Sequence, residues 1–324
     1  MDRVAQLRPR ITGEKPGVES WFVRLNDPTR PRALWLKHTI TVPRGGIPIA
    51  ETWAIGFDGE RVAAYKERLP LEAVLLDGDQ QRVGPTELRP TEGASGGLGA
   101  LSWELAWRPG ALGAPLSLLP FDRMIDGGFP KNKLVTPFPS LRATGTVTVA
   151  GEVIDVKGWI GSLGHNWGAR HAPEYAWAQV VFADDNGEDV AVVEGFSGRV
   201  ALGPLRSPLL SSLVVRTTDG ELRFDRLVDR WRHRVTLEPL AWTLRMRGRA
   251  GEALLTVRAR PAQVASLAYV NPDDTVATCL NSKLASAELR VQPRNGAPFI
   301  CRTEHGAALE RLTLGPLADF PFDA

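Results

Sequence analysis

The stretch LWLKHTITV (residues 34–42) decides the fold class, because its apolar residues recur at every second position. One face of this run carries Leu34, Leu36, His38, Ile40 and Val42. The run IAETWAIGF (residues 49–57) alternates in the same way and places Glu51 and Trp53 on one face with Ile55 and Phe57. A period of two is typical of a β-strand whose one face is buried.

The same alternation continues through the rest of the chain. Further strands are expected at 82–89, 100–107, 143–149, 152–160, 175–183, 189–196, 212–218, 235–247, 253–260 and 284–291. The 32 glycines and 25 prolines favour many turns over long helices, so we expect only short helices near 262–269 and 304–311. Residues 1–19 are expected to form a loosely attached arm. The sequence therefore predicts an all-β protein built from antiparallel barrels or sandwiches.

A repeated residue pattern predicts two domains. Trp53-Ala54 leads through a Phe-Asp-Gly-Glu turn (57–60) to Val62-Ala63, and Trp177-Ala178 leads through similar turn residues (182–188) to Val190-Ala191. A tandem duplication would produce this pattern, although hairpins of this kind are common enough to arise by chance. We expect an N-terminal barrel over residues 1–172 and a C-terminal barrel over residues 173–324.

Charge and composition exclude several classes of protein. The 324 residues include 39 Lys and Arg against 37 Asp and Glu, which argues against a nucleic-acid-binding protein. The arginine-rich hairpin at 245–260 alternates with apolar residues and is expected to be a solvated exterior, which still allows a transient association with a membrane surface. No apolar run is long enough for a membrane helix, and the start lacks a secretory signal, so we expect a cytoplasmic protein.

The most unusual stretch is GWIGSLGHNWGARH (residues 158–171), which combines four glycines with two tryptophans and two histidines. Trp167 beside His165 and Asn166 has the composition of a site that holds an apolar molecule and orients it. The alternative is a plug at a barrel end, with Trp167 over the core and Asn166 fixing the turn backbone. His165 and His171 have no third ligand at a familiar spacing, so no metal site is expected.

This stretch also carries a resemblance to a known family. A strand that ends in a Gly-His-Asn-Trp-Gly turn (164–168), followed by a Tyr-Ala-Trp-Ala-Gln strand (175–179), resembles the carotenoid 1,2-hydratase (hydroxyneurosporene synthase) family and AttH-like proteins. It is also similar to tocopherol cyclases, whose corresponding turn ends in Asn-Trp-Gly. The resemblance implies tandem lipocalin-like β-barrels, and lipocalin-like pericyclases of fungal polyketide pathways are related in fold.

The resemblance further implies an activity. It points to an apolar, isoprenoid- or polyketide-like substrate and to acid-assisted hydration or cyclisation without a redox cofactor, as in a hydratase (hydro-lyase) or cyclase. It carries functional roles over to His165, Asn166 and Trp167. Family hydratases have an acidic residue just before the histidine, and this chain has Gly164 there. The proton donor must therefore be sought elsewhere.

The alternation suggests where such an acid would lie. Glu194 shares a face with Val192 and Phe196, and Gln179 shares one with Tyr175 and Trp177. If these faces and those of Glu51 and His38 point into a barrel, four polar groups line an apolar interior. Burial would raise the pKa of a carboxyl there toward the range of a general acid. The alternatives are that arginines neutralise these carboxylates, or that the faces are inverted.

These observations define the candidate site. We expect four catalytic residues, namely Glu51, Glu194, His165 and Asn166. We expect a second set to bind the apolar ligand, namely His38, Trp53, Trp167, Tyr175, Trp177 and Gln179. No cofactor and no metal are expected. The alternative function is a non-catalytic lipocalin-like carrier, from which an enzyme would differ by an interior acid within reach of the ligand.

Overall fold

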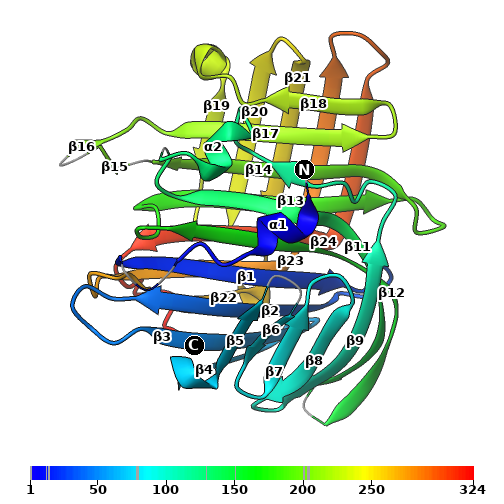
Figure 1. The fold of residues 1–324 in the computed structure, drawn as a ribbon. Helices are drawn as coiled ribbons and strands as arrows, with labels where there is room; N and C mark the ends of the chain where they lie inside the picture. Colours follow the sequence, from blue (N-terminus) through cyan, green and yellow to red (C-terminus); the bar gives the residue numbers. More distant parts are fainter. Residues whose placement is uncertain are drawn as a thin grey trace.

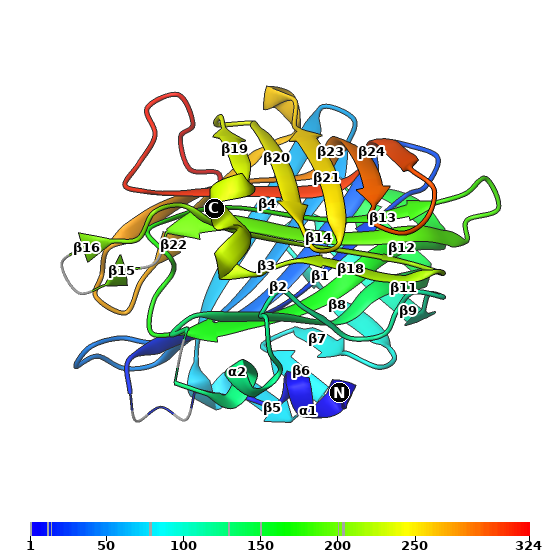
Figure 2. The same cartoon turned by 90° about the horizontal axis from the view of Figure 1, so that it is seen from above.

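The computed structural model describes residues 2–11, 13, 15–77, 80–128, 130–149, 151–199, 201–202 and 205–324. It confirms the all-β prediction, because nearly every element is a strand of one of two large antiparallel sheets. In Figure 1 the N-terminal sheet occupies the lower part of the molecule and the C-terminal sheet the upper part. Seen from above, the C-terminal sheet lies over the N-terminal one (Figure 2).

The N-terminal sheet has the strand order β4-β3-β2-β1-β12-β11-β9-β8-β7-β6-β5, with β10 paired to β11. It curls into a nearly closed barrel, in which β4 contacts β8. Its strands are β1 (Gly17–Asn26), β2 (Arg32–Val42), β3 (Ile49–Asp58), β4 (Arg61–Pro70), β5 (Val74–Asp77), β6 (Gln80–Val83), β7 (Thr86–Arg89), β8 (Gly93–Leu98), β9 (Leu101–Pro109), β10 (Leu116–Ser117), β11 (Lys133–Val149) and β12 (Glu152–Gly168).

The C-terminal sheet has the order β18-β17-β14-β13-β24-β23-β21-β20-β19, with β22 paired to β23. A separate small pair joins β15 to β16. The strands are β13 (Glu174–Ala183), β14 (Asp189–Arg199), β15 (Ala201–Leu202), β16 (Leu205–Arg206), β17 (Leu210–Thr217), β18 (Gly220–Phe224), β19 (Arg234–Leu237), β20 (Ala241–Gly248), β21 (Gly251–Arg258), β22 (Ala265–Val270), β23 (Val276–Pro293) and β24 (Phe299–Leu314).

Helices are short in the part of the chain that the structure describes. They are α1 (Arg3–Leu7), α2 (Arg123–Asp126) and the 3-10 turns η1 (Leu71–Ala73), η2 (Leu227–Arg232) and η3 (Pro261–Gln263). The helix expected near 304–311 is wrong, because these residues belong to β24, and most of 262–269 is strand β22. None of the described helices is both long and apolar enough to cross a membrane.

The N-terminal arm is firmly attached, contrary to expectation. Leu7 is fully buried, and the indole Nε1 of Trp21 donates a hydrogen bond of 2.8 Å to its carbonyl oxygen. Arg3 donates to the carbonyl of Gly113 at 2.8 Å. One apolar side chain and two long-range hydrogen bonds therefore hold helix α1 on the barrel.

The two sheets repeat one topology. Strands β1–β4 and β7–β12 correspond in chain order and in sheet position to β13, β14, β17, β18 and β19–β24. The counterpart of β13 is therefore β1, whereas the repeated pattern in the sequence matched β13 to β3. The match between Trp53 and Trp177 thus joined hairpins that are not equivalent. Strand β12 ends at Gly168 and β13 begins at Glu174, and the domain boundary at residue 172 stays a prediction.

Three apolar cores follow from this arrangement. One lies inside the N-terminal sheet and includes Trp21 and Leu163, and another lies inside the C-terminal sheet and includes Trp242 and Leu255. The third draws residues from both halves and is called the middle layer below. Its buried apolar members include Phe22, Trp35, Trp53, Ile55, Phe57, Ile160, Trp177, Val181, Val192, Val214, Tyr269, Cys279, Ala308 and Leu312.

Candidate functional site

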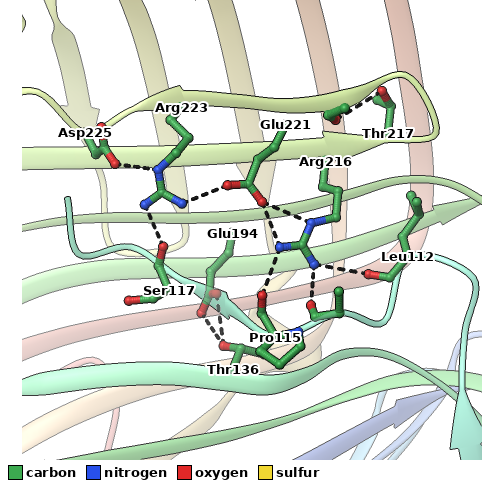
Figure 3. A network of polar contacts seen from close by, with 12 residues as sticks. Leu112, Pro115, Ser117, Thr136, Glu194, Arg216, Thr217, Glu221, Arg223 and Asp225 are labelled. Carbon is green, nitrogen blue, oxygen red and sulfur yellow. Dashed lines mark hydrogen bonds and ion pairs between the residues drawn. The ribbon is translucent and has the colours of Figure 1, made fainter. Parts of the chain in front are cut away.

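Glu194 on β14 is a buried carboxyl of the middle layer, with an exposed fraction of only 1%. Thr136 donates its hydroxyl to the Glu194 carboxylate, 2.9 Å from each oxygen, and the indole Nε1 of Trp177 donates at 3.0 Å (the Thr136 contact is drawn in Figure 3). Burial raises the pKa of Glu194 to about 7, although these two hydrogen bonds favour the charged form and oppose the rise. Near neutral pH the protonated and the charged form of this carboxyl are therefore both populated.

A polar chain lies beside Glu194. Gln179 on β13 is its direct cross-strand partner, and Arg24 on β1 donates its Nε to Gln179 Oε1 at 2.8 Å. Gln179 in turn donates its amide to the carbonyl of Pro139 at 2.7 Å. Arg24 also donates to Asn26 at 2.6 Å. These contacts fix the Gln179 amide and bring a guanidinium from the N-terminal sheet close to the acid.

A second buried carboxyl, Glu310 on β24, lies in the same layer. Lys283 donates its Nζ to Glu310 Oε1 at 2.9 Å, Asn281 donates its amide at 3.1 Å, and the Tyr175 hydroxyl donates to Oε2 at 3.4 Å. The Lys283 side chain is completely buried. The sequence analysis missed this pair, although Lys283 is the only charged residue between 276 and 287 in a strand-like run.

Lys37 on β2 is a third feature of the layer. Like the Glu310–Lys283 pair, it was not predicted from the sequence. Its Nζ lies 3.9 Å from the centre of the Tyr269 ring, 5.5 Å from that of Trp53 and 5.7 Å from that of Trp35. The residue is 4% exposed. Burial lowers its pKa to about 8. Its position on the face of Trp35, opposite that of Leu34 and Leu36, was the available signal.

The structure divides nine of the ten predicted site residues between two regions, and the tenth, Asn166, is described below. Six contribute to the middle layer or line its edge, namely Glu51, Trp53, Tyr175, Trp177, Gln179 and Glu194. Three lie on the inner side of the N-terminal barrel, namely His38, His165 and Trp167. The expectation that the four polar groups share one barrel interior is wrong, because the faces of Glu51, Gln179 and Glu194 point outward, between the sheets.

His165 belongs to a saturated network in the N-terminal core. Its Nδ1 lies 2.6 Å from the carbonyl oxygen of Gln6 and its Nε2 lies 2.7 Å from Glu19 Oε1. The ring stacks on Trp21, with centroids 4.9 Å apart, and packs against Trp167 at 4.7 Å. Both ring nitrogens therefore hold the N-terminal arm in place, and this position favours a structural role.

Asn166 is not in a turn, because residues 158–168 are the second half of strand β12. Its side chain is half-buried and makes no hydrogen bond to any described residue. Glycines of this stretch leave room for side chains and backbone of the neighbouring strand β1. A Cβ at Gly164 would lie 2.4 Å from the Phe22 ring, which pairs with Gly164 across β1 and β12. Phe22 thus fills the space that an acidic side chain at position 164 would need.

Glu51 and His38 are separate from Glu194. The half-exposed Arg68 forms an ion pair with Glu51, with its Nε 2.8 Å from Glu51 Oε1. This matches the alternative in which an arginine neutralises Glu51. His38 Nε2 lies 2.9 Å from the Thr86 hydroxyl, and burial lowers its pKa to about 4. Neither the catalytic role of Glu51 nor the ligand-binding role of His38 is tested by these contacts, and both stay predictions.

An open cavity of about 990 Å³ lies at one end of the middle layer. Its lining includes Asn26, Ile160, Val181 and Gly306, whereas Glu194 and its cross-strand partner Gln179 do not belong to that lining. Asn26 accepts the hydrogen bond from Arg24, so the polar chain described above runs from the cavity lining to Gln179, the cross-strand neighbour of the acid. No group of three or more His, Cys, Asp or Glu suited to a metal ion occurs among the described residues.

The segment 110–119 covers the other side of Glu194 (Figure 3). Arg216 on β17 donates to the carbonyls of Leu112, Ala114 and Pro115, and Arg223 on β18 donates to those of Ser117 and Leu119. The two guanidinium groups are held by Glu221, and Arg223 also by Asp225. A segment of the N-terminal half is thus tied to the C-terminal sheet over the acid.

Comparisons with known proteins agree with this architecture. No family model matches the chain. It is 27% identical over 314 residues to an uncharacterized protein of Mycobacterium tuberculosis, Rv0493c, which covers 95% of this chain and 91% of that protein. The AttH-type protein of Nitrosomonas europaea has a TM-score of 0.59 at 13% identity, over 94% of both chains.

Two further solved structures share the architecture. CghA with Sch210972 has a TM-score of 0.57 at 12% identity, over 92% of this chain and 88% of that one. Kievitone hydratase from Nectria haematococca has a TM-score of 0.53 at 11% identity, over 94% and 93%. The chain shares its fold with these proteins. The finer resemblance to carotenoid hydratases stays a prediction.

Proposed function

We propose that this protein binds an apolar isoprenoid- or polyketide-like molecule in the middle layer and catalyses its hydration or cyclisation with Glu194 as the general acid. The observation that carries the proposal is the carboxyl of Glu194, which is buried among aromatic side chains and has a pKa raised to about 7. A general acid works best when its pKa is near the working pH. The hydratase with the same fold supports the reaction class.

The proposed reaction begins with proton transfer from the Glu194 carboxyl to one carbon of a C=C bond. The π electrons form the new C–H bond, and the other carbon becomes a tertiary cation. Attack by water, followed by loss of a proton to the carboxylate, gives an alcohol. Attack by a second C=C bond forms a ring instead, and loss of a C–H proton to the carboxylate gives an isomer of the substrate.

Aromatic faces beside the acid suit the cationic intermediate. The rings of Phe22 and Trp177 lie at right angles, with centroids 5.8 Å apart, and Trp177 touches the Glu194 carboxylate through its Nε1. An aromatic face attracts a positive charge by about 0.5 to 2 kcal/mol when water is excluded. In this proposal Gly164 lacks an acid because Phe22 occupies its space and Glu194 supplies the proton from the facing sheet.

A non-catalytic carrier is the second candidate. It is favoured by the hydrogen bonds on Glu194, since Thr136 and Trp177 satisfy both carboxylate oxygens without a ligand. A carrier would use the same apolar layer to hold a ligand that leaves unchanged. The two functions differ only in whether the Glu194 proton reaches the bound molecule.

The test uses the purified protein in D₂O with two acyclic probes, geranylgeraniol and neurosporene. Acid-assisted hydration adds one water to the probe, cyclisation leaves its mass unchanged but shifts its retention, and either places a non-exchangeable deuterium on carbon. Glu194→Gln is expected to lower the rate of deuterium incorporation by about 10²- to 10⁴-fold, the usual contribution of a general acid. The matched variant Glu51→Gln removes the charge of the other predicted catalytic carboxyl and shows which of the two supplies the proton.

Each other result has a defined meaning. Loss of turnover in Glu51→Gln with retention in Glu194→Gln would assign the general acid to Glu51 instead of Glu194. Binding of a probe without deuterium incorporation by the wild type would favour the carrier. Absence of binding by both probes would contradict the isoprenoid class.

A further inference from the structure

Lys37 is a buried ammonium without a hydrogen-bond acceptor. No hydrogen bond or ion pair joins its Nζ to any residue that the structure describes; three aromatic rings face it, and Glu310, Glu51 and Lys283 act on it only through space. The indole Nε1 groups of Trp35 and Trp53, two of these rings, also lack a described acceptor. Buried donors nearly always have a partner, so these three donors are available to a bound molecule.

The charges of the middle layer indicate which charge a bound molecule should carry. Its buried cations are Arg24, Lys37 and Lys283, while Glu310 is already paired with Lys283 and Glu194 readily holds a proton. Glu51 is the counterion of Arg68. The carboxylates that act on Lys37 through space, Glu310 and Glu51, are thus already engaged with other cations, and no described carboxylate pairs with its ammonium. A buried cation is tolerated best when an anion accepts its hydrogen bonds.

We propose that the bound molecule carries a carboxylate or an equally acidic oxygen, which Lys37 binds between the rings of Trp53 and Tyr269. The inference rests on the proposed function and narrows its substrate class from a neutral hydrocarbon to an amphiphile with one anionic end. The indole N–H groups of Trp35 and Trp53 supply further donors to that end. The apolar remainder of the molecule then lies along the layer toward Trp177 and Glu194.

The test compares two fluorescent polyene probes, cis-parinaric acid and its methyl ester, which differ only in the negative charge. The wild type is expected to bind the acid more tightly than the ester by about tenfold or more, the effect of one charge-assisted hydrogen bond. Lys37→Met is expected to bind both probes equally. The matched control is Lys66→Met. The Lys66 ammonium lies 4.4 Å from the centre of the same Trp53 ring, but this residue is only partly buried.

The outcomes separate this inference from the proposed function. Equal binding of acid and ester by the wild type overturns the role of Lys37 and leaves the apolar ligand intact. Binding of neither probe overturns both. A second readout guards against misfolding: Lys37→Met should unfold at the same temperature as the wild type or higher, since it removes an unpaired buried charge. A lower unfolding temperature with unchanged probe preference would assign Lys37 a structural role.

A different observation carries a second inference, at the outer edge of the C-terminal sheet. Trp231 and Val228 in η2 are 72% and 69% exposed. Arg234 on edge strand β19 lies directly opposite Arg245 on β20. No carboxylate among the described residues pairs with either of them or with Arg232. Like charges placed opposite each other across two strands are destabilising unless an anion compensates them.

We infer that this patch, defined by Val228, Trp231, Arg232, Arg234 and Arg245, docks on an anionic membrane surface. Trp231 is suited to the interface, where its ring is apolar and its N–H is hydrated. The arginines would attract lipid headgroups, each by about tenfold or less in affinity. Other arginines of this face are already paired, Arg290 and Arg302 with Glu288 and Arg247 with Glu252, and do not belong to the patch.

The test is sedimentation with vesicles of phosphatidylcholine, with or without phosphatidylglycerol. The wild type is expected to bind only the anionic vesicles, and the double variant Arg234→Gln/Arg245→Gln to lose about tenfold or more of that affinity. The matched control is Arg290→Gln/Arg302→Gln, which removes two paired arginines from the same face and should retain binding. Equal loss in both double variants overturns the patch. Absence of vesicle binding, with or without binding to polyglutamate, overturns the membrane assignment.

Discussion

Two buried glutamates of this protein have the same exposed fraction and different chemistry. Glu19 in the N-terminal core accepts hydrogen bonds from the backbone N–H groups of Arg10 and Ile11 and from His165. Glu194 in the middle layer accepts only the Thr136 hydroxyl and the Trp177 indole N–H. Backbone donors cannot leave without unfolding the arm, whereas a hydroxyl can rotate. Saturation by fixed backbone donors therefore favours a structural role for Glu19, and side-chain donors in an apolar layer favour the proton transfer proposed for Glu194.

The largest expected effect comes from breaking the saturated network. Glu19→Gln replaces one acceptor oxygen by an NH₂ group that faces other donors, so buried N–H groups lose their partner. We expect the free energy of unfolding to fall by about 3 to 5 kcal/mol, the usual effect of removing one partner of a buried pair. Urea denaturation followed by tryptophan fluorescence measures it.

The same variant should leave the middle layer unchanged. Binding of cis-parinaric acid to the folded fraction of Glu19→Gln should equal that of the wild type. The comparison fails if Glu19→Gln is as stable as the wild type, or if it abolishes ligand binding while folded.

The next effect is a pH dependence that belongs to Glu194 alone. The pKa of Glu194 is about 7 in the folded protein and about 4.5 in the unfolded chain. Between these values the unfolded chain releases the proton and the folded protein retains it, so stability falls as the pH rises from 4.5 to 7. The total loss is about 3 kcal/mol and is fully present above pH 7.

Glu194→Gln removes this dependence. Relative to the wild type, the variant should gain about 3 kcal/mol between pH 4.5 and pH 8, as measured by urea denaturation at a series of pH values. The buried His38 and His171 act in the opposite direction, because burial lowers their pKa values to about 4 and about 3 and stability rises as they lose protons. Their contribution is common to both proteins and cancels in the difference. An unchanged slope in Glu194→Gln contradicts the raised pKa.

A smaller effect tests why the acid lies in the facing sheet. Gly164→Glu places a carboxyl directly before His165, but its Cβ would meet the Phe22 ring at 2.4 Å. We expect a loss of about 1 to 3 kcal/mol from overpacking. In the background Phe22→Ala the same substitution should cost about 1 kcal/mol less, because the ring is absent. Additive effects in this double-mutant cycle would show that Phe22 does not exclude the acid.

The alternation of apolar residues was sufficient for the fold but not for the direction of the faces. Strand β3 has Ala50 and Ala54 on its inner side and Trp53 and Phe57 on its outer side. The larger side chains point between the sheets because the second sheet covers that face, a long-range contact that a single strand does not encode. The same reason explains why residues 304–311 are a strand, since β23 and β13 flank them on both sides.

The candidate site was predictable in part. Glu194, Gln179 and Trp177 stand out as polar or aromatic residues in buried strands, and the structure brings them together. His165 stood out for its motif, yet its partners Glu19 and Gln6 lie more than 140 residues away in the sequence. Lys37 and Lys283 were missed because an isolated lysine in a strand is normally solvated. Their burial depends on the docking of the two sheets.

The smallest expected effect concerns Thr136, whose hydroxyl is one of the two donors to Glu194. Its hydroxyl hydrogen bond stabilises the charged form of Glu194 and so opposes the rise in pKa caused by burial. Thr136→Val keeps the shape and removes the donor, and we expect the pKa of Glu194 to rise by about 1 unit or less. The steep part of the stability curve should move to higher pH by the same amount, whereas Thr136→Ser should restore it. No displacement in Thr136→Val would mean that burial and the Trp177 indole alone set the proton affinity of this acid.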